Sequence, residues 1–258
     1  TNDAVSFGDI SITGNVSIDT NATNGTGDIT VGAVSGSSNT FGLSTGNNIS
    51  GADITVSGNI SGITTFTLSD VGGTATLSGD VDVTTLTVGN TVANVALNGN
   101  GSTVTNAVSF ANDGTLQLGD ASGDTLTFNG GLTTTSVGGT VTLNGTIASS
   151  DDAITLGAIT LASNTTINSA GGAITTAAIT GSSSEDITIS SSNGSTNTVT
   201  ISGAIGASGN INTVDITGST SVSLGGNIST NDASGNTVSI TSASVDPNSI
   251  TIDTDNSS

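Results

Sequence analysis

The sequence predicts an all-β protein in which short parallel strands stack as a β-solenoid. Apolar–polar–apolar triplets recur along the chain, and alternation with a period of two is typical of β-strands. Thr, Val and Ile are abundant and suit a pleated surface, whereas the helix formers Lys, Arg and Met are absent and Glu occurs once. Gly, Asn, Asp and Ser flank the triplets and supply the tight corners that a coiled chain needs.

The predicted strands run along the whole chain at the spacing expected for strand–turn–strand units, about 8 to 13 residues. They lie at 10–12, 54–56, 66–68, 81–83, 86–88, 116–118, 141–143, 154–156, 187–189, 199–201, 222–224, 238–240 and 250–252. The segment 158–180 is rich in Ala, so we expect a thinner core there. The composition is uniform and Pro247 is the only proline, which predicts one continuous repeat domain over residues 1–258.

Two all-β architectures fit this pattern: a β-solenoid, and one or two Greek-key or jelly-roll sandwiches. Strands of about three to five residues are shorter than those of most sandwiches. The inward positions are uniformly Val, Ile, Leu or Ala, as expected when one coil stacks on the next. These features favour the solenoid, with a coil of about 20 to 24 residues. The sandwich stays the alternative.

The charge of the chain excludes several classes of partner. There is no Lys, Arg or His, and 20 acidic residues give a net charge of −20. Nucleic-acid binding requires cations to neutralise phosphates, so we expect no nucleic-acid partner. An anionic membrane surface is excluded for the same reason. No apolar run approaches the roughly 20 residues of a membrane span, so we expect no membrane insertion.

The residue types available for catalysis argue against an enzyme. Ser is abundant, but a Ser nucleophile needs a base such as His or Lys, and the chain has neither. A pair of carboxylates can cleave a glycosidic bond, which leaves a polysaccharide hydrolase as the enzyme to weigh. Sugar sites usually add aromatic and cationic side chains, and the chain has no Trp, Tyr, Lys or Arg. We therefore predict a non-enzymatic protein without catalytic residues.

Calcium is the ligand that the acidic residues suit best, because Ca²⁺ takes six to eight oxygen ligands from carboxylates, carbonyls and Asn. Two pairs with one residue between their members share a strand face, about 7 Å apart, and a third pair is adjacent at a turn. The low-specificity calcium candidates are Asp80, Asp82, Asp151, Asp152, Asp253 and Asp255. The EF-hand pattern and the calcium-binding nonapeptide repeat are both absent. The alternative is that these acids occupy solvated turns and outward strand positions.

Two stretches carry a resemblance to a known group of proteins. Residues 139–147, with the sequence GTVTLNGTI, and 170–177, with the sequence AGGAITTA, resemble the repeats of filamentous-haemagglutinin-type and autotransporter-type adhesins. Those large bacterial surface proteins form right-handed parallel β-helices. The resemblance implies a β-helical, extracellular protein of the cell surface. It rests on composition and rhythm without a family-specific motif, so it assigns no functional residues.

The two ends of a solenoid bear on function, because bare strand edges pair with other chains unless a cap covers them. Neither terminus carries a predicted helix or a distinct cap, which indicates either an excerpt of a longer repeat protein or a subunit that stacks head to tail. A donated terminal strand is a further route to assembly. We predict a structural segment or subunit of a cell-surface filament or coat, with itself or other surface components as partners.

The alternative function is an adhesin module that binds host or glycan surfaces. Binding hot spots are rich in Trp, Tyr and Arg, and this chain has none of them. That absence favours the structural role.

Overall fold

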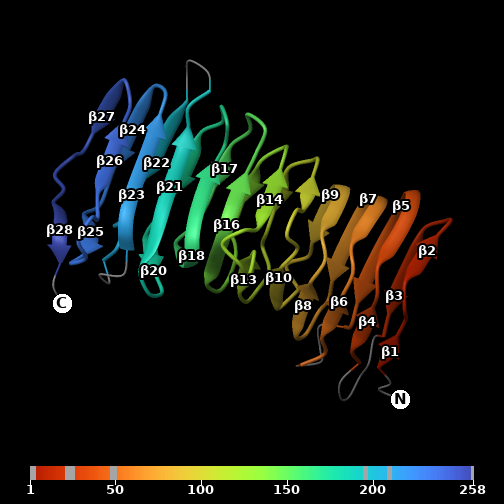
Figure 1. The fold of residues 1–258 in the computed structure, drawn as a ribbon. Coiled ribbons are helices and arrows are strands. Elements are labelled where there is room, and N and C mark those ends of the chain that lie inside the picture. Colours follow the sequence, from red (N-terminus) through yellow and green to blue (C-terminus); the bar gives the residue numbers. More distant parts are fainter. Residues whose placement is uncertain (1–3, 21–26, 47–50, 194–196, 208–210, 257–258) are drawn as a thin grey trace.

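The protein is a parallel β-solenoid of about ten turns, as the sequence predicts (Figure 1). The structure, a computed structural model, describes residues 4–20, 27–46, 51–193, 197–207 and 211–256. These residues form strands and no helix, and every pairing between strands is parallel, for example between β1 (Val5–Ser6) and β4 (Ile29–Val31). In this described part, no helix has the length and apolar character needed to cross a membrane.

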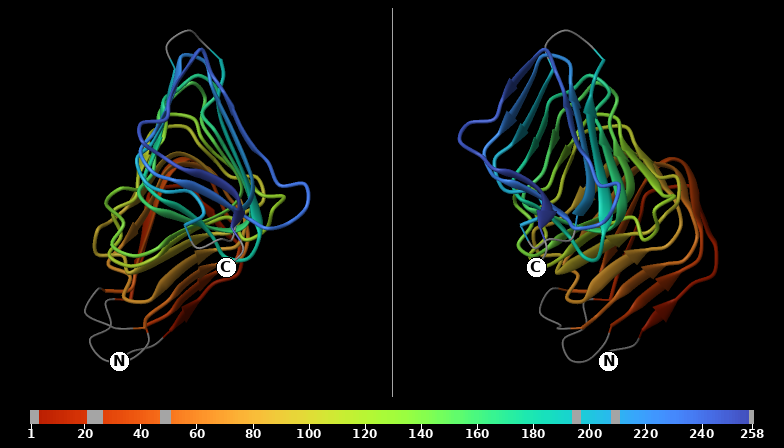
Figure 2. Two further views of the ribbon diagram at one scale, coloured as in Figure 1. Left: turned by 90° about the vertical axis from the view of Figure 1, so that its left-hand side faces the viewer. Right: turned by 60° about the vertical axis from the view of Figure 1, so that its left-hand side comes forward.

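Each turn has three strand positions, and the molecule seen along its axis has a roughly triangular outline (Figure 2). The first face contains β1, β4, β6 (Ile54–Val56), β8 (Thr74–Leu77), β10 (Asn94–Leu97), β13 (Leu116–Leu118), β20 (Ile179–Gly181), β25 (Ile228–Asn231) and β28 (Ile252–Asn256). The second face contains β2 (Ile10–Ile12), β11 (Thr103–Val104), β14 (Thr125–Phe128), β21 (Glu185–Ser191), β23 (Ile211–Gly218) and β26 (Val238–Thr241). The third face contains β3 (Val16–Asp19), β12 (Val108–Ser109), β15 (Leu132–Thr133), β17 (Ile154–Thr155), β19 (Ile174–Thr176), β22 (Thr198–Ile201), β24 (Ser221–Leu224) and β27 (Ser244–Asp246).

Five long strands bend round a corner and belong to two faces, and the corner they cross changes along the rod. In the amino-terminal half, β5 (Val34–Ser44), β7 (Ile60–Ser69) and β9 (Val81–Val88) run from the second face into the third. In the carboxy-terminal half, β16 (Val141–Ala148) and β18 (Ile159–Asn168) run from the first face into the second. The turns between these halves have short strands only, from β10 to β15. The third face then forms a separate seven-stranded sheet from β12 onward.

The coils are stacked in register, so equivalent residues form columns along the rod. One inward column on the first face consists of Val5, Ile29, Ile54, Ala75, Val95, Leu116, Val141, Ile159, Ile179, Ile205, Ile228 and Ile252. Its successive members lie 18 residues apart at the closest (Val141 to Ile159) and 26 at the widest (Ile179 to Ile205). The corners absorb this variation, which explains why no fixed period aligns all the predicted triplets.

The outward columns are polar and almost free of charge. One column on the second face consists of Ser11, Ser35, Ser61, Asp82, Thr103, Thr127, Ala148, Asn168, Ser190, Thr217 and Thr241. Asp82 is the one charged residue in that column. The faces therefore present mainly hydroxyl groups, and most aspartates lie at the corners.

The core is a thin stack of aliphatic side chains with a few aromatic rings. Phe41 and Phe66 occupy registered positions of neighbouring coils, and their rings stack with centroids 5.9 Å apart and planes 14° apart. Phe110 and Phe128 meet edge to face at 6.3 Å. All four rings are fully buried. Ring pairs of this kind add about 0.5–1.5 kcal/mol beyond the burial of their area, so they stabilise two particular coil–coil contacts.

The structure departs from the expected strands near the carboxy-terminal end. Ile250 and Thr251 lie outside β28, which begins at Ile252, because the Thr251 backbone bonds across to the preceding coil as part of a corner: its N–H donates to Asn227 Oδ1 at 3.0 Å. The predicted strand 154–156 ends one residue early, at Thr155. The Ala-rich segment 158–180 winds as regularly as its neighbours and includes all of β18, a ten-residue strand.

Candidate functional site

The corner aspartates and asparagines link each coil to the next by hydrogen bonds. The N–H of Asp53 donates to Asp28 Oδ1 at 3.0 Å, and the N–H of Thr74 donates in turn to Asp53 Oδ1 at 2.7 Å. The same contact, from a backbone N–H to the side-chain oxygen one coil earlier, is made on Asp9, Asn15, Asn59, Asp80, Asp82, Asn94, Asn164 and Asn227. A carboxylate or amide oxygen at a corner or in an outward strand position thus satisfies a backbone donor of the next coil that would otherwise be left to water.

Asp80 and Asp82 lie on consecutive outward positions around the buried Val81, as the sequence pattern indicates. Asp80 Oδ1 accepts the N–H of Gly101 at 2.8 Å, and Asp82 Oδ1 accepts the N–H of Thr103 at 3.1 Å. One oxygen of each carboxylate is therefore engaged by the following coil. The structure brings these two acids near each other, and both act as coil–coil acceptors.

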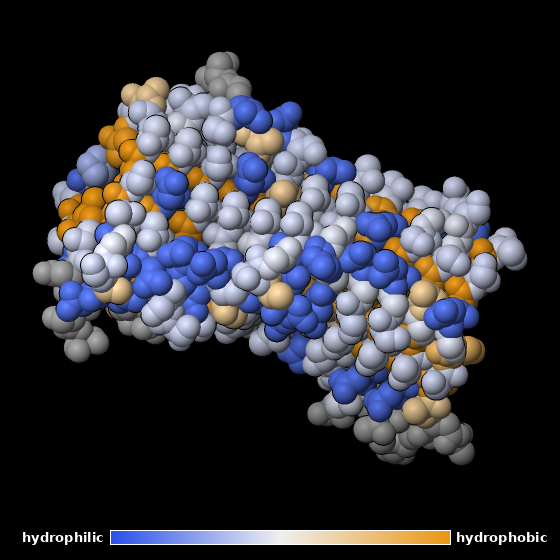
Figure 3. Space-filling view, viewed as in Figure 1, coloured by the Kyte–Doolittle hydropathy of each residue, from blue (hydrophilic) through white to orange (hydrophobic). Residues whose placement is uncertain are grey.

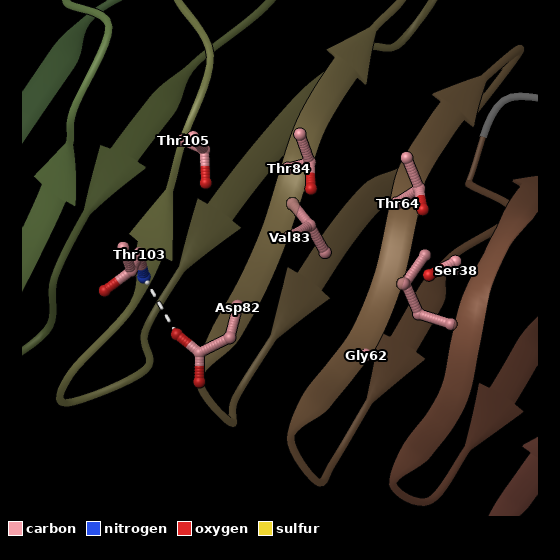
Figure 4. A pocket seen from close by; sticks show the side chains of 9 residues that line it. Ser38, Gly62, Thr64, Asp82, Val83, Thr84, Thr103 and Thr105 are labelled. Atoms are coloured by element: carbon pink, nitrogen blue, oxygen red, sulfur yellow. Dashed lines mark hydrogen bonds between the residues drawn. The ribbon is translucent and has the colours of Figure 1, made fainter.

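An open groove of about 320 Å³ lies beside Asp82, where the chain turns from the second face to the third (Figure 4). Its walls carry threonine hydroxyls from three successive coils: Thr64, Thr84, Thr103 and Thr105. The remaining lining residues are Ser38, Gly62, Ile63, Asp82 and Val83. Asp82 is the one carboxylate among these lining residues, so the groove offers hydroxyl donors and acceptors around a single negative charge.

The surroundings of Asp82 make it harder to ionise. Partial burial raises the pKa of the Asp82 carboxyl, and the negative charge of Asp80 raises it further. The hydrogen bond from Thr103 acts in the opposite direction but does not cancel them. Two like charges at neighbouring outward positions repel, which a bound cation or a proton would relieve.

Asp151 and Asp152 lie at an exposed corner between β16 and β17. Asp151 has a positive φ of 66°, and its carboxylate lies against Gly171 of the next coil, where a Cβ would come within 2.6 Å of Asp151 Oδ1. The Asp152 carbonyl oxygen accepts the hydroxyl of Ser149 at 2.5 Å. A Cβ on Gly171 would also come within 2.6 Å of the backbone carbonyl oxygen of Asn193, and this backbone contact is the one that requires glycine at position 171.

Asp253 lies in β28 and is registered with Ser229 of the preceding coil. Asp255 falls in the same strand, but its side chain lies outside the described residues. No group of three or more His, Cys, Asp or Glu side chains within the described residues is arranged to hold a metal ion. Asp80 with Asp82 and Asp151 with Asp152 thus lie as two separate pairs, and a calcium role for the six candidates stays a prediction.

Glu185 is the only glutamate of the chain and is not among the calcium candidates. Its side chain is 3% exposed. Glu185 Oε1 accepts the Ser182 hydroxyl at 2.8 Å and the Ser183 N–H at 2.9 Å. Burial alone would raise the pKa of Glu185, but these hydrogen bonds and the Ser183 hydroxyl outweigh burial and lower it. Glu185 therefore fixes the tight loop before β21 in its charged form.

Asp124 has a similar structural role in the loop before β14. Its side chain is 5% exposed, and Oδ2 accepts the N–H groups of Asp120 and Ala121 at 2.7 and 2.9 Å. Burial raises the pKa of Asp120, and the neighbouring charge of Asp124 adds to that effect. The spacing Asp120-x-x-x-Asp124, with a glycine directly before each aspartate, was the available signal, because an Asp side chain that bonds nearby backbone N–H groups is typical of such turns.

The two ends of the rod are the most apolar parts of its described surface. In Figure 3 the hydrophobic surface is most extensive on the left, where the carboxy-terminal coils lie. Among the described residues, the large hydrophobic side chains that are exposed are Phe7 at 43% in the first coil, and Val245 at 41% and Ile252 at 47% in the last. The aliphatic core therefore continues to both ends of the described rod.

Comparison with known proteins identifies no relative: no family model, curated protein or solved structure matches this chain. The function therefore has to be argued from the residues and their arrangement.

Proposed function

We propose that this protein is a non-enzymatic, extracellular structural element, a segment or subunit of a cell-surface filament or coat that grows by stacking of solenoid ends. The observation that carries the proposal is the confinement of exposed large hydrophobic side chains, among the described residues, to the first and last coils. Apolar surface beside unpaired strand edges favours association with another chain.

The sides of the rod support the same role. Their outward columns consist mainly of Ser and Thr, which carry no charge, and the corner acids make the molecule strongly anionic. A charge of −20 without side-chain cations opposes lateral clustering. End-to-end contact with soluble sides gives fibres of constant width, as heterologous contacts that do not close produce open filaments. An exposed location agrees with the absence of Lys and Arg, which removes every trypsin cleavage site.

The experiment is negative-stain electron microscopy of the purified protein over a range of concentrations. We expect particles of constant width whose length grows with protein concentration. Ile252→Asp should shorten them because it places a charge on the exposed end, and Thr142→Asp is the matched control because it adds the same charge to the side of the rod. Discrete rods of one length at every concentration would contradict the proposal.

Divalent cations belong to the same proposal, since Ca²⁺ can reduce repulsion between Asp80 and Asp82. We expect millimolar CaCl₂ to raise the melting temperature more than MgCl₂ at equal ionic strength if the pair binds calcium. Asp80→Asn should remove the difference, because the amide keeps the hydrogen bond from Gly101 but not the charge. Equal shifts of the melting temperature with both salts would show that the cations act only by screening charge.

The groove around Asp82 favours a second candidate function, an adhesin module that binds glycans. Threonine hydroxyls from successive coils surround one carboxylate there, an arrangement that can exchange hydrogen bonds with sugar hydroxyls (Figure 4). Glycan-array binding that is lost in Asp82→Ala and retained in Asp215→Ala would support it. Asp215 is the matched control, because it lies on the same face of the rod outside the groove. If the wild-type protein binds no glycan on the array, the adhesin function is contradicted and the structural role is the remaining proposal.

A further inference from the structure

We propose that the groove beside Asp82 selects amino sugars, glycan units that carry a free, protonated amine. The amine binds the Asp82 carboxylate, and the sugar hydroxyls bind the threonines that line the groove. This inference rests on the second candidate function above, the adhesin module, and it names the class of glycan that the module recognises. It is carried by the shape of the groove, by its hydroxyl groups and by its charge.

The groove exists because one corner of the solenoid becomes shorter from coil to coil. Between the registered pairs on either side of the corner, β5 has residues 36–38, β7 has Gly62 alone and β9 has no residue. A corner with fewer residues protrudes less, so the surface steps down from β5 to β9. Ser38 lines the groove on the side of the longest corner, Gly62 adds no side chain, and the buried Val83 lies beyond them. The hollow is therefore set by the lengths of three backbone corners.

Threonine hydroxyls line this hollow on three neighbouring coils. Thr64 lies on β7, Thr84 on β9, and Thr105 directly after β11 (Figure 4). Thr84 and Thr105 are exposed, so their hydroxyls are accessible to a ligand. A hydroxyl both donates and accepts hydrogen bonds, as sugar hydroxyls do. At about 320 Å³ the groove is at the lower end of the range for small-molecule sites, about 300–1,000 Å³, so we expect it to hold a short stretch of glycan.

A sugar in this groove needs a charged contact to bind measurably. The chain has no Trp or Tyr on which a sugar ring could stack. Hydrogen bonds to exposed hydroxyls replace bonds to water and add little net affinity, whereas bonds between charged groups are stronger. Asp82 is the one charged residue among those that line the groove. A protonated amine, with three donors and a positive charge, is the sugar substituent that pairs best with a carboxylate.

The surroundings of Asp82 favour a cation over a neutral or acidic ligand. Asp82 Oδ1 accepts the N–H of Thr103, a bond that does not use Oδ2. The negative charge of Asp80 repels that of Asp82, and a bound amine would relieve this repulsion. The net charge of −20, with no side-chain cation, attracts protonated amines and repels the carboxylates and sulfates of acidic glycans. The groove therefore distinguishes amino sugars from both other classes.

The experiment is an NMR titration of the isotope-labelled protein with two trisaccharides that differ in charge. One is the trimer of glucosamine, whose amines are free, and the other is the trimer of N-acetylglucosamine, whose acetyl groups remove the charge. A lysine tripeptide is the third ligand, because it carries amines without a sugar. The N–H of Thr103 is the reporter, since it bonds to Asp82 Oδ1. The buffer contains EDTA, so that calcium does not compete for Asp80 and Asp82.

Three variants separate the groove from the charge of the whole chain. Asp82→Asn removes the charge and keeps an acceptor for the Thr103 N–H. Asp215→Asn is the matched control, because it changes the net charge equally on the same face of the rod but outside the groove. Thr84→Val removes one groove hydroxyl and keeps the branched side chain. The spectrum of each free variant checks that the fold is retained.

We expect the glucosamine trimer to bind more tightly than the N-acetylated trimer, with affinity about tenfold lower in Asp82→Asn, lower in Thr84→Val and unchanged in Asp215→Asn. Equal affinity for both trimers would overturn selection of the amine while the adhesin function stands. Equal losses in Asp82→Asn and Asp215→Asn would show attraction by net charge alone and overturn the site. Binding of the lysine tripeptide as tight as that of the glucosamine trimer, or full affinity in Thr84→Val, would overturn the choice of a sugar. No shift with either trimer would overturn both the inference and the adhesin function.

Discussion

At the scale of single residues, several acidic side chains of this protein act as hydrogen-bond acceptors between coils. Asp28, Asp53 and Asp80 each accept a backbone N–H from the following coil, and Asn59 and Asn94 do the same with an amide oxygen. Asp and Asn are interchangeable for this contact in geometry, and they differ in charge. The abundance of Asp beyond what the contact needs therefore contributes to solubility more than to the fold.

The interchangeability of the two residues leads to a prediction at Asp80. Asp80→Asn should keep the bond from Gly101 and reduce repulsion of Asp82, so the midpoint of urea unfolding should stay the same or rise. Asp80→Leu keeps the branched shape but has no acceptor, and should destabilise by about 0.5–1.5 kcal/mol, the usual net value of one hydrogen bond. A loss in Asp80→Asn as large as in Asp80→Leu would show that the charge itself is needed.

At Glu185, unlike at Asp80, we expect removal of the negative charge to destabilise the protein. Replacement by Gln should destabilise by about 1–3 kcal/mol, because the donors of Ser182 and Ser183 lose a charged acceptor. Since folding lowers the pKa of Glu185, the stability it contributes is present above the pKa of the unfolded chain and is lost as pH falls through the folded pKa. Melting curves from pH 7 downward should show the difference between wild type and variant shrinking in acid. A difference independent of pH would mean that packing, not ionisation, causes it.

At the scale of the structural element, the feature that organises each coil is the corner. Gly62 lies where β7 turns from the second face to the third, with φ of +68°. A Cβ at this position would come within 2.2 Å of the Gly36 carbonyl oxygen of the preceding coil. Only glycine allows both the backbone angle and the close approach of the two coils, so the continuous strand can bend there.

Gly62→Ala should therefore destabilise the rod strongly. The left-handed backbone alone costs about 1–2 kcal/mol for a residue with a Cβ, and the contact with Gly36 adds to it. Gly123→Ala is the control, because no atom lies within 4 Å of the added methyl and the backbone needs no positive φ. Thermal unfolding should separate the two variants clearly. Similar melting temperatures would show that the corner between β5 and β7 can rearrange.

The fold class and most strands could be predicted from the sequence, because a period of two with β-branched residues is a local signal. Triplets such as 10–12 and 116–118 are the strands β2 and β13 without change. The corners could not be predicted, because the same Gly and Asn residues serve a bend within a strand at Gly62 and a break between strands elsewhere. Only the registered neighbour, here Gly36, decides between them.

The candidate site was predictable to a smaller extent. The pairing of Asp80 with Asp82 followed from their spacing, but their bonds to Gly101 and Thr103 depend on which coil lies above. The burial of Glu185 and Asp124 could not be predicted, because it follows from loop geometry and not from a motif. Inter-coil contacts of about 21 residues' separation leave no signal in a single sequence when coil length varies.

At the scale of the whole molecule, the absence of every basic side chain changes the response to acid. Ordinary proteins become strongly positive at low pH and unfold through that repulsion, whereas this chain moves from −20 toward neutrality. Asp82 and Asp120 have raised pKa values in the folded state. A group of this kind favours folding below its unfolded pKa, and that contribution is lost as pH rises through the folded pKa.

We expect the melting temperature to rise as pH is lowered from 7 to about 4, near the pKa of Asp, with particles lengthening over the same interval. Glu185, whose pKa is lowered, acts in the opposite direction to Asp82 and Asp120. Added NaCl at pH 7 should reproduce part of the effect by screening. Differential scanning calorimetry with light scattering measures both quantities. A melting temperature that falls steadily in acid would show that the repulsion between aspartates does not limit stability.

The length of the coils has a mechanical consequence. Each coil of 18 to 26 residues adds only about 4.8 Å to the height of the rod. Pulled open, the same coil reaches roughly 60 to 90 Å at the 3.3–3.6 Å per residue of an extended chain. Because a coil contacts only its neighbours, tension along the axis would peel coils one at a time from an end. Each released coil would lengthen more than tenfold, and a fibre built in this way would dissipate a sudden load in steps before any covalent bond is strained.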